Sequence, residues 1–278
     1  KINRKPVKVV ALFGFTCLAL WFGFVVSQTQ DDIIVVHLTN VQVKECAEFR
    51  PKISKHELAV YLEILKTFVK VMENNNLTYW LYSGSLLGSY RHHGMIPWDD
   101  DIDVTMPVHE MEKTFEVLNS LKPHFLLVRG KERMKFYSHK SRKIRRDVWW
   151  RFPFLDISLY YVQKNGTKEI ICDNDKTFPE FVYNYTDVFP LIKRPFEGLL
   201  LNAPHHTKKV LERTYDLNEC VSNRFIHKTE LHVKRQLVTK CEELKGFFPF
   251  VSRRKTLKGT NETLEMNDIV KSWWLDKI

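Results

Sequence analysis

The chain has 278 residues, of which 44% are hydrophobic and 27% are charged. This balance is typical of a folded globular protein, and the length allows one large domain or two small ones. The formal net charge of +10 would suit an anionic partner. The basic residues are scattered along the chain, however, and no nucleic-acid-binding motif accompanies them, so we expect no nucleic-acid partner.

The N-terminal region predicts a membrane anchor. Residues 9–27 carry no charged side chain and come close to the ~20 residues that cross a bilayer as a helix. Basic residues precede this segment and two aspartates follow it. The positive-inside tendency therefore predicts a cytosolic tail (1–8), a transmembrane signal-anchor (9–27) and a lumenal remainder, as in a single-pass type II protein of the Golgi or ER membrane. The alternative is a cleaved signal peptide ending near Ser27, although the apolar core of such a peptide usually runs for about 7–15 residues.

Glycosylation sequons and cysteines fit the same secretory location. Asn-X-Thr sequons on the side predicted to be lumenal make four asparagines candidates for N-glycosylation: Asn76, Asn165, Asn184 and Asn261. Outside the apolar segment the cysteines are even in number, which allows one or two disulfides in an oxidising compartment, with buried free thiols as the alternative. These cysteines are Cys46, Cys172, Cys220 and Cys241. No Cys-X-X-Cys motif is present, and we expect no zinc site.

A polar stem at 28–53 leads into an amphipathic helix. Ser54 is a candidate N-cap, and Glu57 three residues later completes the sequence pattern of a capping box. Apolar residues then recur at three- and four-residue steps as far as Met72. The run of asparagines at 74–76 is expected to end the helix.

The remaining elements alternate between strands and helices. An aromatic run at 77–82 predicts a strand that leads into Ser83-Gly84-Ser85 and a short helix. Further strands are expected at 102–105, 125–128, 135–138 and 154–162, and helices at 108–121 and 206–215. The stretch from about 163 to 205 appears rich in loops, and helical patches are expected at 228–244 and 267–275. The order predicts an α+β fold, with a small mixed sheet flanked by helices.

An acidic run at 99–103 is the strongest candidate for chemistry. Side chains alternate along a strand, so Asp101 and Asp103 would point to one side while Ile102 and Val104 enter the core. Two such carboxylates lie roughly 7 Å apart along the backbone and can converge on one cation. Mg²⁺ prefers one or two carboxylates together with substrate phosphates and water. A solvated loop is the alternative, but the neighbouring apolar residues favour a metal site.

Two further features point to the same chemistry. Gly84-Ser85 directly follows a strand, where glycine and a helix N-terminus would let the backbone approach a phosphate closely. Asp156 lies inside a strongly apolar strand, and a buried carboxylate needs a cation or hydrogen-bond donors. The alternative for Asp156 is a core acid paired with an arginine or with the backbone. A Gly-Ser turn, an Asp-X-Asp strand and a third strand acid form the general layout of the nucleotidyltransferase fold.

This layout resembles the LicD family, which includes fukutin and fukutin-related protein. The resemblance rests first on YWLYSGSLLGSYRHHGMIPWDDDIDVTM at 79–106, with its Gly-Ser-Leu-Leu-Gly turn and Ile-Pro-Trp-Asp run. It continues in FPFLDISLY at 152–160 and in VFPLIKRPFEGLLLNAPHHTKKVLERTYD at 188–216. The similar part therefore implies a nucleotidyltransferase-like domain at 54–216, followed by a C-terminal extension at 217–278 that packs on it.

The resemblance implies phosphotransfer. Such enzymes move a phosphorylated alcohol, such as ribitol phosphate or phosphocholine, from a CDP-linked donor to a glycan hydroxyl. Carried over by motif, the metal ligands for Mg²⁺ (or Mn²⁺) and catalytic residues would be Asp101, Asp103 and Asp156, with Asp156 also accepting the proton of the attacking hydroxyl. The substrate-binding residues would be Gly84, Ser85, Arg91, His92 and Asp99, with Gly84 and Ser85 at a phosphate and Arg91 and His92 at a second phosphate or the transferred group.

Other residues of the motif and two other functions stay open. Asp100 occupies a variable position of the motif, Trp98 is expected to pack in the core, and His93 is expected on the surface. A metal-dependent nucleotide-sugar glycosyltransferase is an alternative function, because such enzymes also use Asp-X-Asp behind an N-terminal anchor. A non-catalytic glycan-binding member of the family is the third possibility.

Overall fold

The computed structural model describes residues 46–130, 133–165, 167–172 and 179–276, together with two short strands, β1 (Ser27–Gln28) and β2 (Ile33–Val35). Apart from Ser27, the predicted signal-anchor lies outside this part of the chain, as does most of the predicted stem. Among the described residues, no helix is both long enough and apolar enough to cross a membrane.

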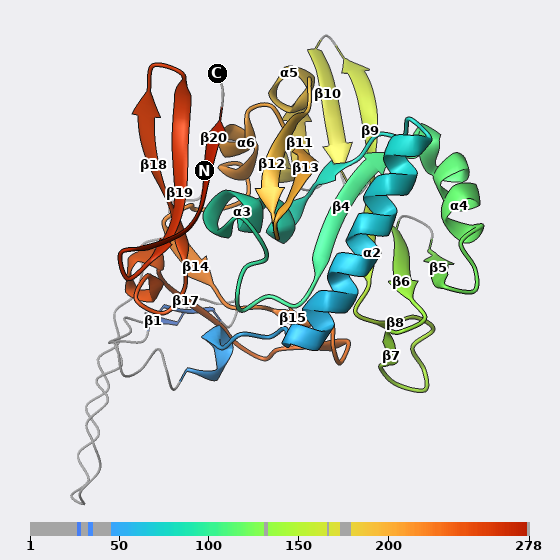
Figure 1. Ribbon diagram of the computed structural model, residues 1–278, viewed down its shortest axis with the longest axis horizontal. Helices are drawn as coiled ribbons and strands as arrows, with labels where there is room; N and C mark the ends of the chain where they lie inside the picture. The colour runs from blue at the N-terminus through green and yellow to red at the C-terminus, as the bar shows by residue number, and fades with distance from the viewer. Residues whose placement is uncertain are drawn as a thin grey trace, which may run out of the picture.

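A mixed sheet forms the centre of the molecule (Figure 1). Its main path runs β11 (Val182–Asn184), β10 (Thr167–Cys172), β9 (Leu155–Asn165), β4 (Ile102–Pro107) and β3 (Trp80–Leu81). β6 (Arg133–Ser138) also pairs with β9, and β5 (Phe125–Arg129) pairs with β6. β4 and β9 run parallel, with Asp103 opposite Asp156, whereas the other pairs of this sheet are antiparallel. The predicted α+β fold with a small mixed sheet is confirmed.

The long helix α2 (Lys55–Asn74) covers one face of this sheet, against β6 and β9. It begins as the sequence predicts, because the Ser54 hydroxyl accepts from the backbone of Glu57 while the Glu57 carboxylate accepts from the backbone of Ser54. The helix residues Ile64, Leu65 and Phe68 are fully buried. The predicted capping box therefore sets the start of the helix that closes the core.

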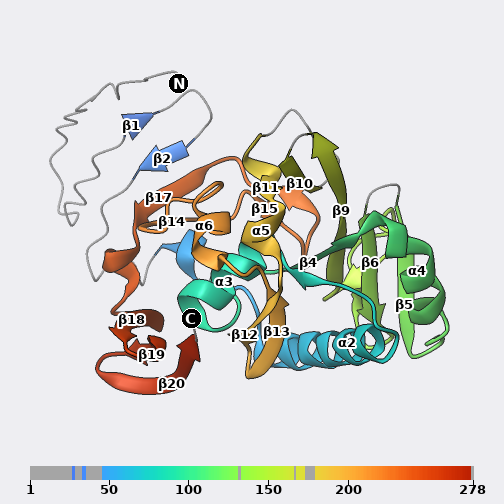
Figure 2. The same ribbon diagram turned by 90° about the horizontal axis from the view of Figure 1, so that it is seen from above.

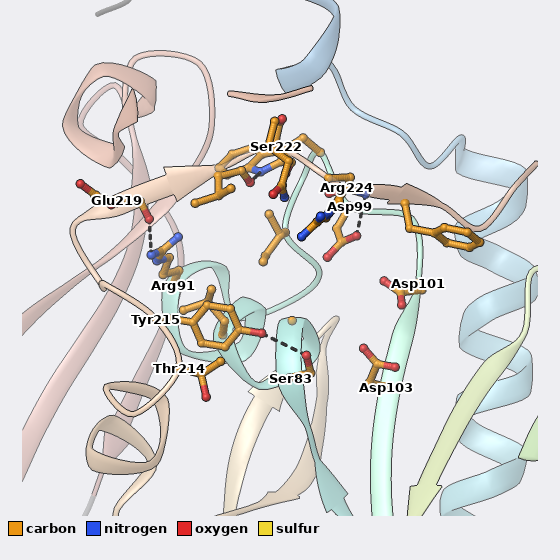
Figure 3. Close-up of a pocket in the computed structure, with 18 of the residues that line it drawn as sticks. Ser83, Arg91, Asp99, Asp101, Asp103, Thr214, Tyr215, Glu219, Ser222 and Arg224 are labelled. Carbon is orange, nitrogen blue, oxygen red and sulfur yellow. Dashed lines mark hydrogen bonds between the residues drawn. The ribbon is translucent and has the colours of Figure 1, made fainter. Parts of the chain in front are cut away.

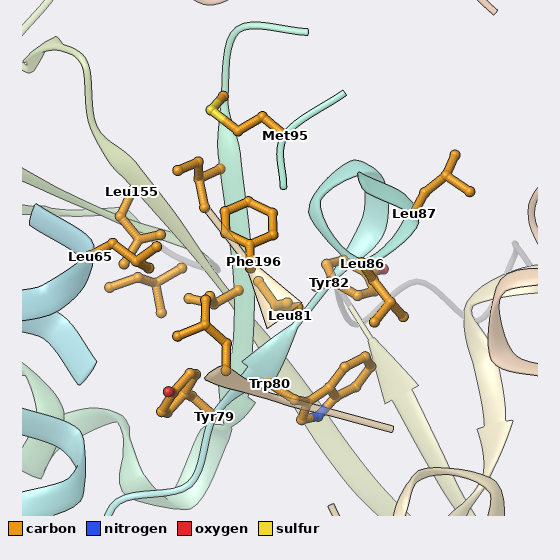
Figure 4. Close-up of a cluster of buried hydrophobic side chains, with 14 of the residues drawn as sticks. Leu65, Tyr79, Trp80, Leu81, Tyr82, Leu86, Leu87, Met95, Leu155 and Phe196 are labelled. Atoms are coloured by element: carbon orange, nitrogen blue, oxygen red, sulfur yellow. The ribbon is translucent and has the colours of Figure 1, made fainter. Parts of the chain in front are cut away.

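The other main helix of the core, α3 (Ser83–His92), follows β3 directly. Trp80 and Leu86 lie in one continuous apolar cluster with Phe196 (Figure 4). Gly88 faces the backbone on the far side of the following turn, and a Cβ there would lie 2.3 Å from the carbonyl oxygen of Gly94. This close approach brings the chain straight back toward the acidic run and β4.

The remaining helices and strands surround this core. Between β4 and β9 lie η2 (Val108–Glu110), α4 (Met111–Asn119), β7 (Arg142–Lys143) and β8 (Arg151–Phe152), and η1 (Ala47–Phe49) precedes α2. The stretch expected to be rich in loops contains η3 (Pro179–Phe181), α5 (Tyr185–Val188) and the hairpin of β12 (Ile192–Phe196) and β13 (Leu199–Ala203). The helix expected at 206–215 is the shorter α6 (Thr207–Leu211).

The C-terminal part is built from strands. β14 (Glu219–Val221) and β17 (Gln236–Lys240) form a sheet with β1 and β2, and β15 (Phe225–Ile226) pairs with β16 (Leu231–His232). After η4 (Cys241–Leu244), β18 (Phe250–Thr256), β19 (Gly259–Met266) and β20 (Ile269–Asp276) form a three-stranded sheet. Figure 2 shows this sheet at one end of the molecule and α4 at the other.

The helical patches expected at 228–244 and 267–275 are wrong. Asn267 and Asp268 both have positive φ, 50° and 62°, which suits a tight hairpin turn and no helix. β20 therefore folds back along β19. In the earlier patch, β17 is fixed by pairing with β14 and with β2, of which β2 is far away in sequence. Strand pairing overrode both helical patterns, through a hairpin in β20 and partly through a distant strand in β17.

Candidate active site

Three aspartates of the acidic run line a cavity of about 540 Å³: Asp99, Asp101 and Asp103. In Figure 3 the side chains of Asp101 and Asp103 extend from the same side of the β4 segment toward this cavity. Ile102 and Val104 are buried in the core, 1% and 0% exposed. The alternation that the sequence predicts is thus observed, and it gathers the carboxylates on one wall.

Asp156 lies next to Asp103, because the two residues are directly opposite each other on the parallel strands β4 and β9. It is 3% exposed, and its Oδ2 accepts a hydrogen bond of 2.8 Å from Lys135 Nζ on β6. No hydrogen bond from a described residue reaches its Oδ1. A lysine therefore neutralises the buried Asp156. The sequence had suggested a cation, an arginine or the backbone as its partner.

The start of α3 lies beside β4 and forms another part of the cavity wall. A Cβ at Gly84 would lie 3.0 Å from Asp99 Oδ2, so glycine leaves room for this carboxylate. Ser85 is buried, and its hydroxyl accepts the backbone N–H of Asp103 at 2.7 Å. The Ser83 hydroxyl lies 3.0 Å from the Tyr215 hydroxyl. Gly84 therefore lines the cavity as predicted, whereas Ser85 fixes β4 from behind.

Arg91 and His92, at the other end of α3, occupy different places. Arg91 lines the cavity, but its guanidinium donates to the carbonyl oxygens of Asp216 (2.9 Å) and Glu219 (2.6 Å), and burial lowers its pKa to about 10. His92 lies in the core and outside the cavity wall. Burial lowers its pKa to about 3, so the neutral ring donates Nδ1–H to the carbonyl of Pro249 at 2.7 Å. The structure does not bring His92 to the acidic residues.

A segment that begins at the end of the last motif of the resemblance and continues beyond it closes the cavity. We call residues 214–227 the closing arm; most of them line the cavity, and Figure 3 shows Thr214 and Tyr215 facing it from the side opposite Asp101 and Asp103. The side-chain amide of Asn223 donates to Asp99 Oδ1 at 2.8 Å. The cavity wall therefore combines residues from both sides of the predicted domain boundary at 216.

His227, at the end of the closing arm, contacts two acids of the run. Its Nδ1 lies 3.2 Å from Asp100 Oδ1 and its Nε2 lies 3.3 Å from Asp101 Oδ2. Asp100 is 1% exposed, although the motif gave it a variable position. Neither contact has a local signal in the sequence, because 127 residues separate Asp100 from His227.

The closing arm is fixed by a disulfide between Cys220 and Cys241. Cys46 and Cys172 form no disulfide with a described residue. One of the one or two disulfides that the cysteine count allows is therefore present among the described residues. It ties β14, which begins at Glu219 of the cavity wall, to the start of η4.

The acidic run holds more negative charge than its surroundings neutralise. Burial, followed by the charge of Asp103, raises the pKa of Asp101 well above 3.8. Burial, followed by the charge of Asp156, raises the pKa of Asp103 to about 7. The pKa of Asp99 is raised by burial and by Asp100. Burial would lower the pKa of His227, but the hydrogen bond to Asp100 and the nearby carboxylates outweigh it and raise that pKa.

This donor set suits a cation. Asp100, Asp101 and His227 each offer one ligand atom, and these atoms all lie within 4.8 Å of one another. The carboxylate of Asp103 faces the same cavity, and the positive charges that act on it include those of His227 and Arg133. Carboxylate oxygens are the ligands that Mg²⁺ and Mn²⁺ accept most readily, and a bound cation would offset the charge that raises the pKa values of these acids.

Two residues outside the cluster complete the comparison with the sequence. Trp98 is 1% exposed and packs edge-on against Phe49, which confirms that it is a core residue. His93, expected on the surface, is 6% exposed, because β19 and β20 cover it with Glu262 and Ser272. The expectation for His93 was therefore wrong.

The glycosylation sequons lie in various surroundings. Asn76 and Asn184 are exposed, and Asn261 is half-buried in β19. Asn165 ends β9, and its side chain is outside the description of the structure. Attachment of a glycan at each of them stays a prediction.

Residues 76–206 match the family model described as "LicD/FKTN/FKRP, nucleotidyltransferase domain". This segment is a LicD-family nucleotidyltransferase domain. It contains Gly84, Asp101, Asp103 and Asp156, whereas the closing arm with His227 follows it in the chain. The resemblance drawn from the sequence motifs is confirmed.

Several curated proteins resemble the chain. An uncharacterized protein of Rickettsia typhi is 29% identical over 180 residues, which cover 65% of this chain and 52% of that protein. Ribitol 5-phosphate transferase FKRP of Homo sapiens is 27% identical over 162 residues, 54% of this chain and 30% of that protein. Lipopolysaccharide cholinephosphotransferase LicD of Haemophilus influenzae is 33% identical over 91 residues, 32% of this chain and 34% of that protein. The chain thus spans about half, or less, of the length of these relatives.

A comparison with solved structures gives a more distant similarity. The lincomycin-bound lincosamide antibiotic adenylyltransferase LnuA aligns with 59% of this chain and 89% of its own, with a TM-score of 0.34 and 14% sequence identity.

Proposed function

We propose that the chain is a divalent-metal-dependent phosphotransferase that moves a phosphorylated alcohol, such as ribitol phosphate or phosphocholine, from a CDP-linked donor to a glycan hydroxyl. The observation that carries the proposal is the placement of Asp101 and Asp103 on one side of β4, in a cavity that Gly84 also lines and next to Asp156, within a LicD-family domain. Ribitol 5-phosphate transferase FKRP and cholinephosphotransferase LicD are relatives with these two transfer activities in their names.

In this proposal Asp101 and Asp103 hold a Mg²⁺ or Mn²⁺ ion. When bound, the ion would supply positive charge to the diphosphate of the donor and to the leaving cytidine monophosphate. Gly84, at the start of α3, lets a phosphate approach the helix N-terminus, and Arg91 lies at the rim of the cavity. The buried Oδ1 of Asp156, which no described donor reaches, would accept the proton of the attacking hydroxyl, while Lys135 holds Oδ2 in place.

We also propose that the protein works in the secretory pathway, in the Golgi or ER, anchored by residues 9–27 with the domain in the lumen. The Cys220–Cys241 disulfide supports an oxidising compartment. The exposed sequon asparagines Asn76 and Asn184 support exposure to the glycosylation machinery. Glycosidase treatment of the protein from cells tests this location, because a lumenal domain should shift in mobility and a cytosolic one should not.

The test of the proposed reaction combines ligand binding with turnover. The purified chain is heated with Mn²⁺ or Mg²⁺ and with CMP, CDP, UDP or GDP, and CMP release is measured from CDP-ribitol and CDP-choline. A nucleotide present at about 100 times its Kd should stabilise the protein by ~2.7 kcal/mol. Metal-dependent stabilisation by cytidine nucleotides, with CMP release, supports the proposal.

Other outcomes would favour other functions. Stabilisation by UDP or GDP alone would favour a nucleotide-sugar glycosyltransferase. Binding of cytidine nucleotides without CMP release from either donor would favour a non-catalytic member of the family. No binding of any nucleotide with either metal would overturn the proposal.

A further inference from the structure

We propose that His227 is a ligand of the divalent cation at this site, and that Asp100 is the residue that orients its imidazole. The proposal rests on the metal-dependent function put forward above and adds a residue from outside the matched domain. His227 lies 21 residues beyond residue 206, where the family match ends. It is also the one histidine among the described residues that line the cavity.

The imidazole lies between two carboxylates with different surroundings. Nδ1 is 3.2 Å from Asp100 Oδ1, and Nε2 is 3.3 Å from Asp101 Oδ2. A histidine that binds a metal almost always directs its second ring nitrogen at a carboxylate or a carbonyl, which fixes the ring and its tautomer. Here the buried Asp100 takes that place on the Nδ1 side, so Nε2 is the nitrogen that faces the cavity-lining acid Asp101.

The carboxylate of Asp100 already accepts hydrogen bonds from the end of the closing arm and from the residue after it. Its Oδ1 accepts the backbone N–H of His227 at 3.2 Å, and its Oδ2 accepts the backbone N–H of Lys228 at 3.0 Å. With 1% of its surface exposed, it lies behind the cavity wall, which includes Asp101 and Asp103 but not Asp100. These contacts assign Asp100 a positioning role and leave Asp101, Asp103 and His227 as the groups that face the ion.

The separation of the two facing atoms suits a shared cation. Two ligand atoms about 2.1 Å from one ion, at angles between octahedral and tetrahedral, lie roughly 3.0–3.4 Å apart. The 3.3 Å between His227 Nε2 and Asp101 Oδ2 falls in this range. Asp103 contributes its carboxylate from the same side of β4 and lines the same cavity.

The position of His227 is set by packing as well as by Asp100. Its ring lies edge-on to Phe154 and Phe225, with centroids 6.0 and 4.9 Å away. The next residue, Lys228, reaches Glu57 Oε2 of α2 at 2.7 Å. A ligand held in this way needs little reordering when the ion binds.

An imidazole ligand changes which ion the site prefers. Mg²⁺ favours oxygen ligands and retains its water, whereas transition-series ions accept imidazole nitrogen. We therefore expect the chain to bind Mn²⁺ more tightly than Mg²⁺, and we expect this preference to fall when His227 is replaced by a residue with an oxygen ligand.

The test is pulsed electron paramagnetic resonance of Mn²⁺ bound to the purified full-length chain. The expected spectrum shows modulation from a directly bound ¹⁴N nucleus, which changes to the ¹⁵N pattern when the histidines are labelled with ¹⁵N. His227→Gln should remove this modulation and weaken Mn²⁺ binding at least about 10-fold, and Asp100→Asn should weaken binding about 10–100-fold. His232→Gln is the matched control, because His232 is exposed and packs against the same Phe225 ring, and it should change neither result.

Three results would overturn the proposal: bound Mn²⁺ without histidine modulation, modulation that survives in His227→Gln, or no binding of Mn²⁺. The wild-type spectrum alone decides whether a histidine is bound, so the test does not depend on the folding of His227→Gln. Circular dichroism without metal shows whether that variant is folded. Since none of these readouts is turnover, CMP release measured on the same wild-type preparation separates a wrong ligand assignment from a wrong proposed function.

Discussion

The two ends of α3 carry buried clusters of charge with opposite balances. At the N-terminal end, beside Gly84, several carboxylates of the acidic run face a cavity, and the histidine that contacts them is His227. At the C-terminal end, beside His93, a single carboxylate of β19 meets several cationic groups. Glu262 accepts from Arg194 at 2.7 Å and from Arg253 at 2.8 Å, and it lies 3.1 Å from His93 Nε2.

The different balances act in opposite directions on the pKa values. Burial raises the pKa of Asp103 to about 7, and the neighbouring Asp156 adds to the effect. Burial would also raise the pKa of Glu262, but its hydrogen bond with His93 and the two arginines outweigh this and lower it to about 2. A buried cluster with surplus carboxylates lowers the free energy of unfolding until a cation binds, as at many functional sites. A cluster whose charges are balanced instead links the helix and the strands that supply its residues. The charge balance therefore distinguishes the candidate cation site at the N-terminal end of α3 from the structural link around Glu262 at its C-terminal end.

The largest expected effect tests the structural link. Glu262→Gln removes the nearer of the two carboxylates that pair with the buried guanidinium of Arg194, which is 1% exposed, and leaves Asp276 at 3.5 Å. We expect the free energy of unfolding to fall by about 3–5 kcal/mol, because the loss of one partner leaves a buried charge uncompensated. Urea denaturation measures this.

The control for this variant is Glu112→Gln, which breaks the exposed ion pair with Arg129. A surface pair contributes about 0–1 kcal/mol, so the control should change stability little. If both variants lose the same small amount of stability, the neutralised cluster does not hold the C-terminal sheet to α3, and the comparison between the two ends of the helix fails.

The next effect concerns the surplus of carboxylates. Asp101→Asn should lower turnover about 10²–10³-fold, or ~3–4 kcal/mol of transition-state stabilisation, because it removes a proposed metal ligand. The unfolding free energy without metal should not fall, since the substitution also relieves repulsion among Asp99, Asp101 and Asp103. CMP release and urea denaturation of the same preparation measure the two quantities, with the exposed Asp147→Asn as control. Full turnover in Asp101→Asn would contradict the metal assignment.

Both clusters should make the free energy of unfolding depend on pH. The contribution of Glu262 should be on the order of 3 kcal/mol. Glu262 has a lower pKa in the folded state (about 2) than its ordinary 4.5, so its contribution is complete above about pH 4.5 and is lost as the pH falls toward 2. Asp103 has a raised pKa of about 7, so its cost to stability is present above that pH and disappears as the pH falls through 7 toward 3.8. Metal-free stability should therefore rise on mild acidification and then fall.

Urea denaturation between pH 8 and pH 2.5 measures this profile. Saturating Mn²⁺ should flatten the upper part, because a bound cation keeps the carboxylates ionised, and Glu262→Gln should remove most of the lower part. A profile whose upper part is unchanged by the metal would contradict the assignment of the carboxylates to a cation site.

Local sequence signals predicted the elements that depend on neighbouring residues. The capping box of Ser54 and Glu57 set the start of α2, and the alternation along β4 placed Asp101 and Asp103 on one side. Both features need only a few residues of context. The motif resemblance then gave the family, which the match of residues 76–206 confirms.

Features that depend on distant contacts were missed. His93 looks like a surface residue until β19, with Glu262 169 residues away, covers it. His227 has no motif around it, and its contact with Asp101 comes from the tertiary packing of the closing arm, which the pairing of β14 with β17 and the Cys220–Cys241 disulfide hold in place. Strand pairing also overrode the helical pattern of β20. Such contacts arise from tertiary packing and leave no periodicity to read.

The smallest expected effect tests whether Asp156 belongs to the cation site or is a neutralised structural acid. Lys135 neutralises Asp156 as the arginines neutralise Glu262, yet Asp156 lies opposite Asp103 of the acidic run. Lys135→Gln leaves the buried Asp156 Oδ2 without its charged donor, so the metal-free free energy of unfolding should fall by about 1–3 kcal/mol. If Asp156 belongs to the cation site, Mn²⁺ should restore part of this loss, and the stabilisation by Mn²⁺ should be larger in Lys135→Gln than in the wild type. Lys140→Gln, which breaks the exposed pair with Glu63, is the control and should respond to Mn²⁺ as the wild type does. An equal response to Mn²⁺ in all three proteins would place Asp156 with Glu262, as an acid whose role is to hold strands together, and would leave Asp101 and Asp103 as the acids of the cation site.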